Sequence, residues 1–422
     1  MASIIAIAFG ILATTYCFFY FLLREYGLPI YTLRLPFQRI YVVNGTSLIP
    51  VLQKHWRTIS FAALTASAGA VCGMSPHSAR VMNHDLKNEE GFSISWPRYI
   101  APSLAPGSKD LDAINKKSVE VFSAELARQR AKGPKTTGLV EWSKQLMIRS
   151  TTEAIYGPSN PYKENAIAEA WKLFESGFLN FSIFPAAMAF SPKFRRARDL
   201  VTGAMVDYMQ QGGHEQASGL VRKRFEHHRS WGLSIDDVGR GEVGNTFAIL
   251  GNSTPCAFWL LYHIFSDKKV LSDIRRELLG LVRDDQNDDE NVCSIDLADI
   301  RSSCPLRSST FQEVLRYRSL GVGPRFVLED VFLEGQTLCP GRHFASTEIM
   351  MLAAVSVLQF DILPVGGRWV EPTSERSPSG ASFPIPDEDI NVQLRPRDLT
   401  KEWHISFSGP GEAIKIAMED LA

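Results

Sequence analysis

The sequence has few of the patterns that mark common classes of protein. None of its six cysteines forms a Cys-x-x-Cys pair, so neither a disulfide framework nor a zinc module is indicated. No GxGxxG turn follows an expected strand, and no P-loop, GxSxG elbow or internal repeat is present. The formal net charge is only −1, which gives no argument for nucleic acid as a partner. A reducing compartment with one functional cysteine fits this composition best.

Charged residues are absent from residues 2–23, where Ile, Leu, Ala, Phe and Tyr dominate. An apolar run of about 20 residues spans a bilayer as a helix. No basic residue precedes the run, whereas Arg24, Arg34 and Arg39 follow it, so the rest of the chain is expected in the cytosol. We therefore predict a transmembrane anchor over residues 1–23 and one further domain over residues 24–422. A signal sequence, cleaved or uncleaved, is the alternative.

Helical spacing of apolar residues dominates the middle of the chain. It predicts helices over residues 111–132, 139–156, 164–179 and 194–211. β-branched and aromatic residues predict two short strands at 29–33 and 39–43, and the acidic tract 284–290 is typical of a solvated loop. This is not an alternating βαβ pattern, so we expect a mainly α fold with small β elements.

Cys339 is the strongest candidate for chemistry, because an apolar helix is expected directly after it. Unpaired backbone N–H groups and the helix dipole at such a position favour a thiolate over a thiol. Pro340 fixes φ at a helix start, and Gly341 lets the backbone pass close to a flat partner. A thiolate presented in this way can ligate haem iron. From local physics alone, a buried structural cysteine is an equal alternative.

A second candidate is the apolar helix expected over residues 244–266, which is interrupted by a polar notch at residues 251–255. Pro255 has no N–H to donate to the carbonyl of Gly251, so the helix should kink and leave that carbonyl free. Asn252 and Thr254 stand beside it, and a ligand or water could hydrogen-bond there. The alternative is a second transmembrane helix, in which such a notch would be costly against lipid.

A third candidate is the pair formed by Glu313 and Arg316. Three residues apart on a helix, the two side chains share a face and can form an ion pair. Taken alone this signal is weak, because surface pairs with this spacing are common.

Together and in this order, the three segments resemble the cytochrome P450 superfamily, from the anchor to about residue 408. Residues 335–345 are similar to its haem-ligand signature, Glu313 and Arg316 to its ExxR pair, and the notch to the point where the long central helix crosses the haem. The resemblance implies the cytochrome P450 fold, haem b as cofactor, and Cys339 as the axial ligand of the iron, with Gly341 close to the haem.

The branch that this chain resembles most contains fungal relatives of the bile-acid 7α-/12α-hydroxylases and prostacyclin synthase, which share an Asn-x-x-Pro notch. Asn252 and Thr254 stand where most of the superfamily has an acid–alcohol pair that delivers protons. The resemblance also makes Arg325 the partner of a haem propionate, and residues 382–386 and 394–397 a C-terminal hairpin beside the substrate.

The function implied by the resemblance is that of a monooxygenase, which inserts oxygen from O2 into a lipophilic small molecule in secondary metabolism or in sterol or terpenoid oxidation. Electrons would come from NADPH–cytochrome P450 reductase, at the endoplasmic reticulum membrane, with a single membrane span and a cytosolic catalytic domain. Two alternatives stay open: a haem-thiolate isomerase or dehydratase that needs no reductase, and a truncated membrane protein without catalysis.

The chain departs from the family in two regions: after the anchor, where Leu23 leads into Arg24 without the proline-rich hinge that usually follows, and before Cys339. Cys339 follows Arg316 by only 23 positions, whereas the family normally has several dozen residues more between these points. Gly335 and Gln336 are joined directly to Thr337, so we expect that a segment has been lost between 335 and 337. The loss would remove packing on the proximal face of the haem and a partner for Glu313 and Arg316.

Overall fold

The computed structural model describes residues 30–35, 38–43, 48–55, 57–88, 90–183, 185–284, 292–296, 304–319, 325–329, 342–377, 383–399 and 401–407. The chain divides into two compact units. The smaller unit comprises residues 1–61 and 325–338, and the larger one comprises residues 62–324 and 339–422.

The smaller unit contains two pairs of short strands. β1 (Ile30–Leu35) and β2 (Gln38–Val43) are antiparallel, with Leu35 opposite Gln38, which confirms the two strands predicted from β-branched and aromatic residues. After α2 (Leu48–Lys54), β3 (Ile59–Ser60) pairs antiparallel with β7 (Phe326–Val327). This pairing joins two segments that are far apart in the sequence, and it brings Arg325 close to Phe61.

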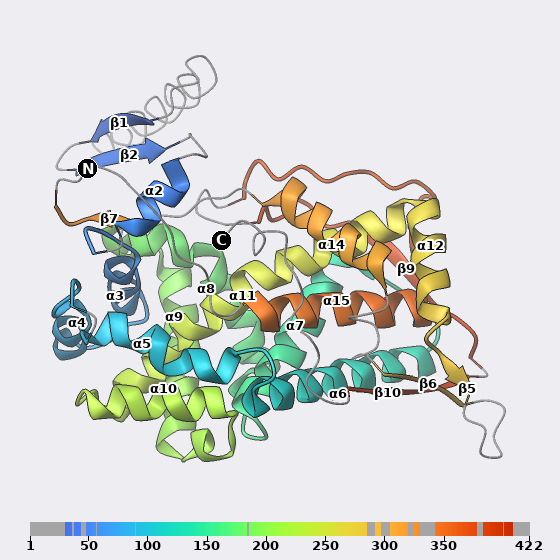
Figure 1. The fold of residues 1–422 in the computed structure, drawn as a ribbon, viewed down its shortest axis with the longest axis horizontal. Helices are drawn as coiled ribbons and strands as arrows, with labels where there is room; N and C mark the ends of the chain where they lie inside the picture. Colours follow the sequence, from blue (N-terminus) through green and yellow to red (C-terminus); the bar gives the residue numbers. More distant parts are fainter. Residues whose placement is uncertain are drawn as a thin grey trace. The chain divides into compact units, whose positions relative to one another are not determined.

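The larger unit is built mainly from helices (Figure 1), as predicted. The helical segments from residue 61 onward are α3 (Phe61–Val71), α4 (Pro76–Asn83), α5 (Phe92–Ile100), η1 (Ala101–Leu104), α6 (Lys109–Ala131), α7 (Leu139–Tyr156), η2 (Pro161–Lys163), α8 (Asn165–Ile183), η3 (Pro185–Phe190), α9 (Pro192–Gln210), η4 (Gly213–Gln216), α10 (Gly219–Ser230), α11 (Ile235–Ser266), α12 (Lys268–Leu279), α14 (Pro305–Arg318) and α15 (Arg342–Gln359).

The ends of several helices follow from their sequence. Ser108 precedes α6 and accepts a hydrogen bond from the backbone N–H of Leu111 at 3.1 Å, which satisfies one of the unpaired groups of the first turn. Ser234 caps α11 in the same way through the N–H of Asp237. Gly157, with φ of 72°, ends α7 in a backbone conformation that favours glycine.

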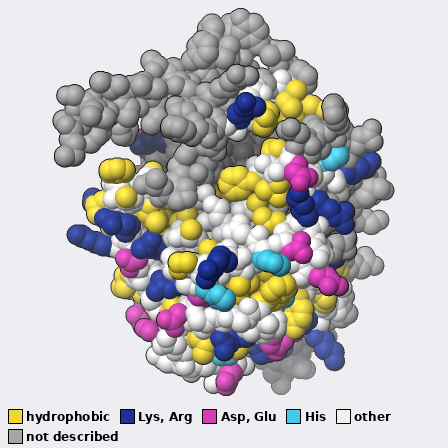
Figure 2. All heavy atoms as spheres, turned by 90° about the vertical axis from the view of Figure 1, so that its left-hand side faces the viewer, with side chains coloured by type: hydrophobic (Ala, Val, Ile, Leu, Met, Phe, Trp, Pro, Cys, Tyr) yellow, Lys and Arg dark blue, Asp and Glu magenta, His cyan; other side chains and the backbone are white. Residues whose placement is uncertain are grey.

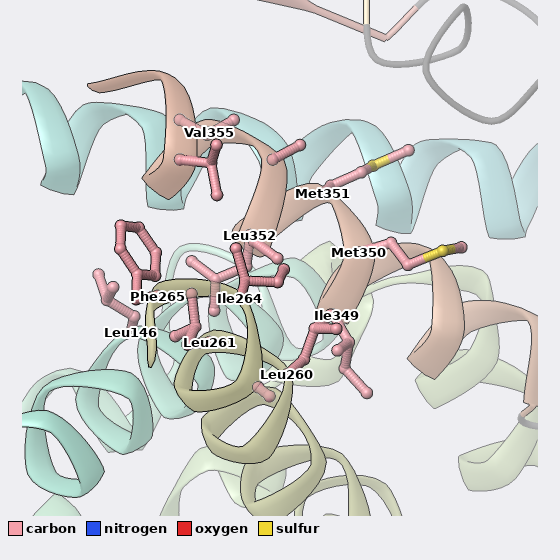
Figure 3. Close-up of a cluster of buried hydrophobic side chains, with 14 of the residues drawn as sticks. Leu146, Leu260, Leu261, Ile264, Phe265, Ile349, Met350, Met351, Leu352 and Val355 are labelled. Atoms are coloured by element: carbon pink, nitrogen blue, oxygen red, sulfur yellow. The ribbon is translucent and has the colours of Figure 1, made fainter. Parts of the chain in front are cut away.

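The core of the larger unit lies around α11 and α15. Apolar side chains from both helices pack together with Leu146 of α7 (Figure 3), and all of those labelled in the figure are buried. α11 is helical without interruption through Pro255. It extends nine residues further towards its N-terminus than the apolar pattern predicted.

Two three-stranded sheets flank the helices. One has the order β4-β9-β8, formed by β4 (Lys135–Gly138), β9 (Asn391–Pro396) and β8 (Phe360–Pro364). The other has the order β10-β6-β5, formed by β10 (Glu402–Ser406), β6 (Val292–Asp296) and β5 (Arg283–Asp284). The expected hairpin between residues 382–386 and 394–397 is not formed, because β9 pairs with β4 and β8 instead, and residues 383–390 contain no strand.

No helix within the described ranges is both long enough and apolar enough to cross a membrane. The predicted anchor, residues 1–23, lies outside those ranges, as does most of the acidic tract 284–290, so both stay predictions. On the face of the molecule that Figure 2 presents, basic and acidic side chains are interspersed with hydrophobic ones rather than gathered by sign.

Candidate functional site

α11 and α15 run in the same direction through the core (Figures 1 and 3). Leu260 of α11 lies near Ile349 of α15, and both belong to the same buried cluster. The polar notch of α11 precedes Leu260, and the start of α15 precedes Ile349. The notch and the N-terminus of α15 therefore lie towards the same end of this helix pair. In the sequence, α15 begins three residues after Cys339.

The three polar side chains of the notch differ in their surroundings. The hydroxyl of Ser253 donates to the carbonyl of Ile249 at 2.7 Å, as serines in helices often do. Thr254 is buried, and its Oγ1 has no hydrogen-bond partner among the described residues. Asn252 is exposed. A buried hydroxyl without a partner is rare in a folded protein, so Thr254 Oγ1 is suited to bind a ligand or water.

The segment after β8 reaches α11 close to the notch. The indole Nε1 of Trp259, five residues after Thr254, donates to the carbonyl of Pro384 at 2.7 Å, and Phe383 is buried. Residues 383–386 therefore lie against the central helix although they do not form the expected hairpin.

Cys339 and Gly341 lie outside the described residues, so their predicted roles stay predictions. Four other cysteines are described, and all are buried and free of disulfides: Cys72, Cys256, Cys293 and Cys304. Burial raises the pKa of Cys72 to about 12, and burial likewise raises the pKa of Cys256. At neutral pH both are thiols, which are poor ligands for iron compared with a thiolate.

Glu313 and Arg316 form the predicted ion pair on α14. Arg316 donates from Nε to Glu313 Oε2 at 2.7 Å and from Nη2 to Glu313 Oε1 at 2.5 Å. The hydrogen bond from Arg316 lowers the pKa of the Glu313 carboxyl. Both side chains are largely exposed, at 60% for Glu313 and 69% for Arg316. The described part of the chain therefore does not cover this pair.

Arg325 belongs to the smaller unit. Its guanidinium lies over the ring of Phe61, 4.7 Å from the centroid, and desolvation lowers its pKa. The planar guanidinium of arginine can stack on an aromatic ring and has the geometry that suits a carboxylate. Its predicted pairing with a haem propionate stays a prediction.

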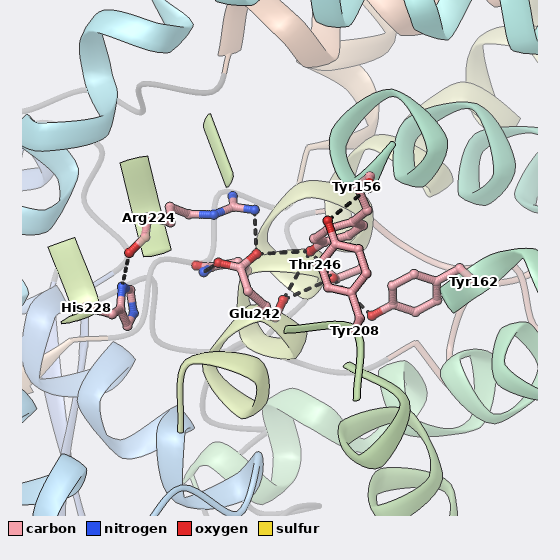
Figure 4. Close-up of polar contacts among 8 residues, drawn as sticks. Tyr156, Tyr162, Tyr208, Arg224, His228, Glu242 and Thr246 are labelled. Carbon is pink, nitrogen blue, oxygen red and sulfur yellow. Dashed lines mark hydrogen bonds and ion pairs between the residues drawn. The ribbon is translucent and has the colours of Figure 1, made fainter. Parts of the chain in front are cut away.

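A buried ion pair that the sequence did not indicate lies nine residues before the start of the notch on α11. Figure 4 shows this pair. Arg224 of α10 donates from Nη2 to Glu242 Oε2 of α11 at 2.6 Å, and the two side chains are only 2% and 1% exposed. Asn245 donates to the other carboxylate oxygen at 2.9 Å. His228 is held against the carbonyl of Arg224 at 2.7 Å.

Three tyrosines complete this network. The hydroxyls of Tyr156 and Tyr162 lie 2.6 and 3.1 Å from Thr246 Oγ1, and Tyr208 donates to the carbonyl of Tyr156 at 2.9 Å. Burial, followed by the nearby charge of Glu242, raises the pKa of Tyr156 well above its usual value. These tyrosines are therefore neutral hydrogen-bonding groups that hold α7, α9 and α11 together.

A second buried carboxyl, Glu348, lies in the apolar helix α15. It is 2% exposed, and its Oε1 accepts hydrogen bonds from hydroxyls of α6 and α7. The sequence shows that Glu348 stands among apolar residues. The hydroxyl groups that bind its carboxyl come from α6 and α7, which are far away in the sequence. No group of three or more potential metal ligands occurs among the side chains within the described ranges.

Comparison with known proteins identifies two relatives that match most of this chain. Cytochrome P450 monooxygenase nodJ of Hypoxylon pulicicidum is 27% identical, over 93% of this chain and 88% of its own length. A cytochrome P450 monooxygenase of Gibberella zeae is 23% identical, over 89% of this chain and 83% of its own length. No protein-family model matches the chain.

The two relatives support the cytochrome P450 superfamily for this chain. Both are named monooxygenases, which confirms the prediction of an enzyme of the cytochrome P450 monooxygenase class. The class implies a haem cofactor, a redox partner and a small-molecule substrate. The mainly helical fold with small sheets is consistent with this class.

Proposed function

We propose that the chain is a haem-thiolate monooxygenase that inserts oxygen from O2 into a lipophilic small molecule. Haem b binds through Cys339, and electrons come from NADPH–cytochrome P450 reductase. Residues 1–23 anchor the protein in the endoplasmic reticulum membrane, and residues 24–422 form a cytosolic haem domain. Secondary metabolism and sterol or terpenoid oxidation are the substrate areas that the resemblance suggests.

The observation that carries this proposal is the arrangement of α11 and α15. The two helices bring a notch with a buried, unpartnered hydroxyl and the helix that follows Cys339 to one end of the core. A helix N-terminus favours a thiolate over a thiol, which a haem iron requires of its cysteine ligand. The buried cysteines with raised pKa values do not offer this environment.

When bound, haem supplies an iron whose thiolate ligand pushes electron density towards it and favours O–O cleavage. The chain's own residues supply binding and proton handling. Thr254 Oγ1 can both accept and donate a hydrogen bond, and no described group competes for it. The carbonyl of Gly251 receives no N–H from Pro255 and is a further acceptor beside it. Asn252 adds an exposed amide.

We further propose membership of the branch related to the 7α-/12α-hydroxylases and prostacyclin synthase, together with a lost segment near residues 335–337. The Asn252-to-Pro255 notch supports the branch. The alignments to the two relatives extend over 459 and 445 residues, more than the 422 of this chain, so the relatives carry residues without a counterpart here. The exposure of Glu313 and Arg316 is what the loss of a covering segment would produce.

An isomerase or dehydratase is the second candidate, because the notch carries no carboxylate. The carboxylate of α11 that comes next before Thr254 in the sequence is Glu242, and it is already occupied by Arg224. A reaction that needs no external electrons does not need proton delivery of the kind that an acid–alcohol pair provides. Turnover that depends on NADPH and reductase supports the monooxygenase, and turnover without them supports the isomerase or dehydratase.

The test is spectroscopy of the reduced, CO-bound full-length protein in membranes. We expect a red-shifted Soret band in the parent protein and its loss in Cys339→Ala, because the band requires a thiolate ligand to the iron. Cys72→Ala is the matched control, since it removes a buried thiol from another part of the same unit. A parent protein without haem, or a band that survives in Cys339→Ala, would falsify the proposal.

A further inference from the structure

Glu348 is a charged residue in an otherwise apolar stretch of α15. It is the seventh residue of that helix and is followed directly by Ile349, Met350, Met351 and Leu352, all of them buried. Its carboxylate oxygen Oε1 lies 2.8 Å from Ser118 Oγ of α6 and 2.7 Å from Thr151 Oγ1 of α7. One oxygen of α15 is therefore bonded to two other helices of the core.

Three hydroxyl groups lie within hydrogen-bond distance of Glu348 Oε1, but not all of them donate to it. A hydroxyl has one proton, and Ser150 Oγ lies 2.9 Å from the carbonyl of Leu146 but 3.1 Å from Glu348 Oε1. Ser150 therefore satisfies its own helix first. Ser118 and Thr151 are the two firm donors to Glu348, one from α6 and one from α7.

Glu348 is buried, so the hydrogen bonds from Ser118 and Thr151 determine where its carboxyl lies. Burial raises its pKa to about 7, and the bonds from Thr151, Ser118 and Ser150 partly oppose that rise. Its second oxygen, Oε2, is buried without a described partner. A carboxyl in such a place is kept in one position by the hydroxyls that reach it, because a hydrogen bond is directional.

The position of α15 matters because α15 follows Cys339. The helix begins at Arg342, three residues after the cysteine, and Glu348 lies in its second turn. The apolar contacts of Ile349 to Leu352 bury area but do not fix the rotation or the sliding of a helix, since the hydrophobic effect is non-directional. The bonds of Glu348 provide a directional restraint near the start of α15.

We propose that Glu348 is a positioning residue for Cys339: it ties α15 to α6 and α7 and so fixes the helix start that presents the thiolate to the haem iron. This inference rests on the proposed function. It assigns to a residue nine positions from the cysteine a role in the geometry of the iron–sulfur bond, with no contact to the haem required.

The test compares Glu348→Leu with Glu348→Gln in the full-length, haem-loaded protein. Leucine removes the acceptor, whereas glutamine keeps an Oε1 that Ser118 and Thr151 can still reach. We expect Glu348→Leu to lose most of the red-shifted CO band in favour of a band without thiolate ligation, and to shift the reduction potential of the iron. Glu348→Gln should keep the parent's band and potential. Thr347→Val is the matched control, because its hydroxyl is buried in the same turn without a described partner.

Each possible result either supports or overturns the positioning role of Glu348. If Glu348→Leu has the same CO band per haem and the same reduction potential as the parent protein, the positioning role is overturned. The proposed function is not affected by this result, because the parent protein still shows the band. A Glu348→Gln protein altered as much as Glu348→Leu also overturns it, since the charge rather than the attachment would then matter. A parent without the band overturns both proposals. If Glu348→Leu does not fold, the double variant Ser118→Ala with Thr151→Val removes the same bonds from the other side, and an unchanged band there rejects the proposal.

Discussion

Glu242 and Arg224 meet inside the molecule with almost no exposure to water. Removing one partner of such a pair leaves a buried charge without compensation, at a cost of about 3–5 kcal/mol. We therefore expect Glu242→Leu and Arg224→Met each to lower the free energy of unfolding by this amount in urea titrations. The double variant Arg224→Met with Glu242→Leu should be much less destabilised than the sum of the single variants, whereas additive losses would contradict a direct interaction.

His228 gives the folded state a predictable response to acid. Burial lowers its pKa to about 4, well below the value of about 6.5 in an unfolded chain. As the pH falls through about 6.5, His228 takes up a proton in the unfolded state, whereas in the folded state it stays neutral until the pH approaches about 4. The stabilising contribution of the neutral imidazole is therefore complete above about pH 6.5 and is lost progressively towards pH 4, by up to about 3 kcal/mol.

The measurement is the free energy of unfolding from about pH 7 to about pH 5, for the parent and for His228→Phe. The variant should lose less stability over this range than the parent, because phenylalanine takes up no proton. His77→Phe is the matched control, since it makes the same replacement at an exposed position. Parallel profiles for the parent and His228→Phe would show that His228 does not set the acid sensitivity.

At the scale of single elements, α7 begins with a cap supplied from far away in the sequence. Asp389 accepts hydrogen bonds from the backbone N–H groups of Val140 at 2.7 Å and Glu141 at 2.9 Å. We expect Asp389→Ala to lower the free energy of unfolding by about 1 kcal/mol, as the loss of a helix cap usually does. Glu388→Ala, one residue earlier and exposed, is the control and should leave stability unchanged. An equal loss in both variants would mean that the cap has no special role.

The same element shows what local sequence can predict. α7 has the bounds predicted for it, 139–156, because Gly138 and Gly157 bracket a continuous helical pattern. The start of α11 was missed, since its first turns mix glycines with charged residues and carry no clear apolar stripe. The pairing of β9 with β4 was missed as well, because it joins segments about 250 residues apart and no local pattern encodes such a register.

Some residues of the candidate site could likewise be predicted from the local sequence, and others could not. Asn252, Thr254 and the Glu313–Arg316 pair could be named from local spacing, and the structure describes all four. Glu242 and Glu348 could not be assigned a role from the sequence, because a buried carboxylate is defined by partners on other helices: Arg224 for one, Ser118 and Thr151 for the other.

At the scale of the whole molecule, the exposed ion pair on α14 bears on the short connection to Cys339. In solvent, an ion pair of this kind is screened by salt and contributes little to stability. We therefore expect Glu313→Ala and Arg316→Ala to leave both the haem content and the thermal midpoint of this chain unchanged at physiological ionic strength. Haem retained per mole of protein and the unfolding midpoint are the two measurements. A large loss of either would mean that a part of the chain outside the described residues covers the pair. Unchanged values would instead show that this chain holds its haem domain together without the pair, through the helices around α11 and α15.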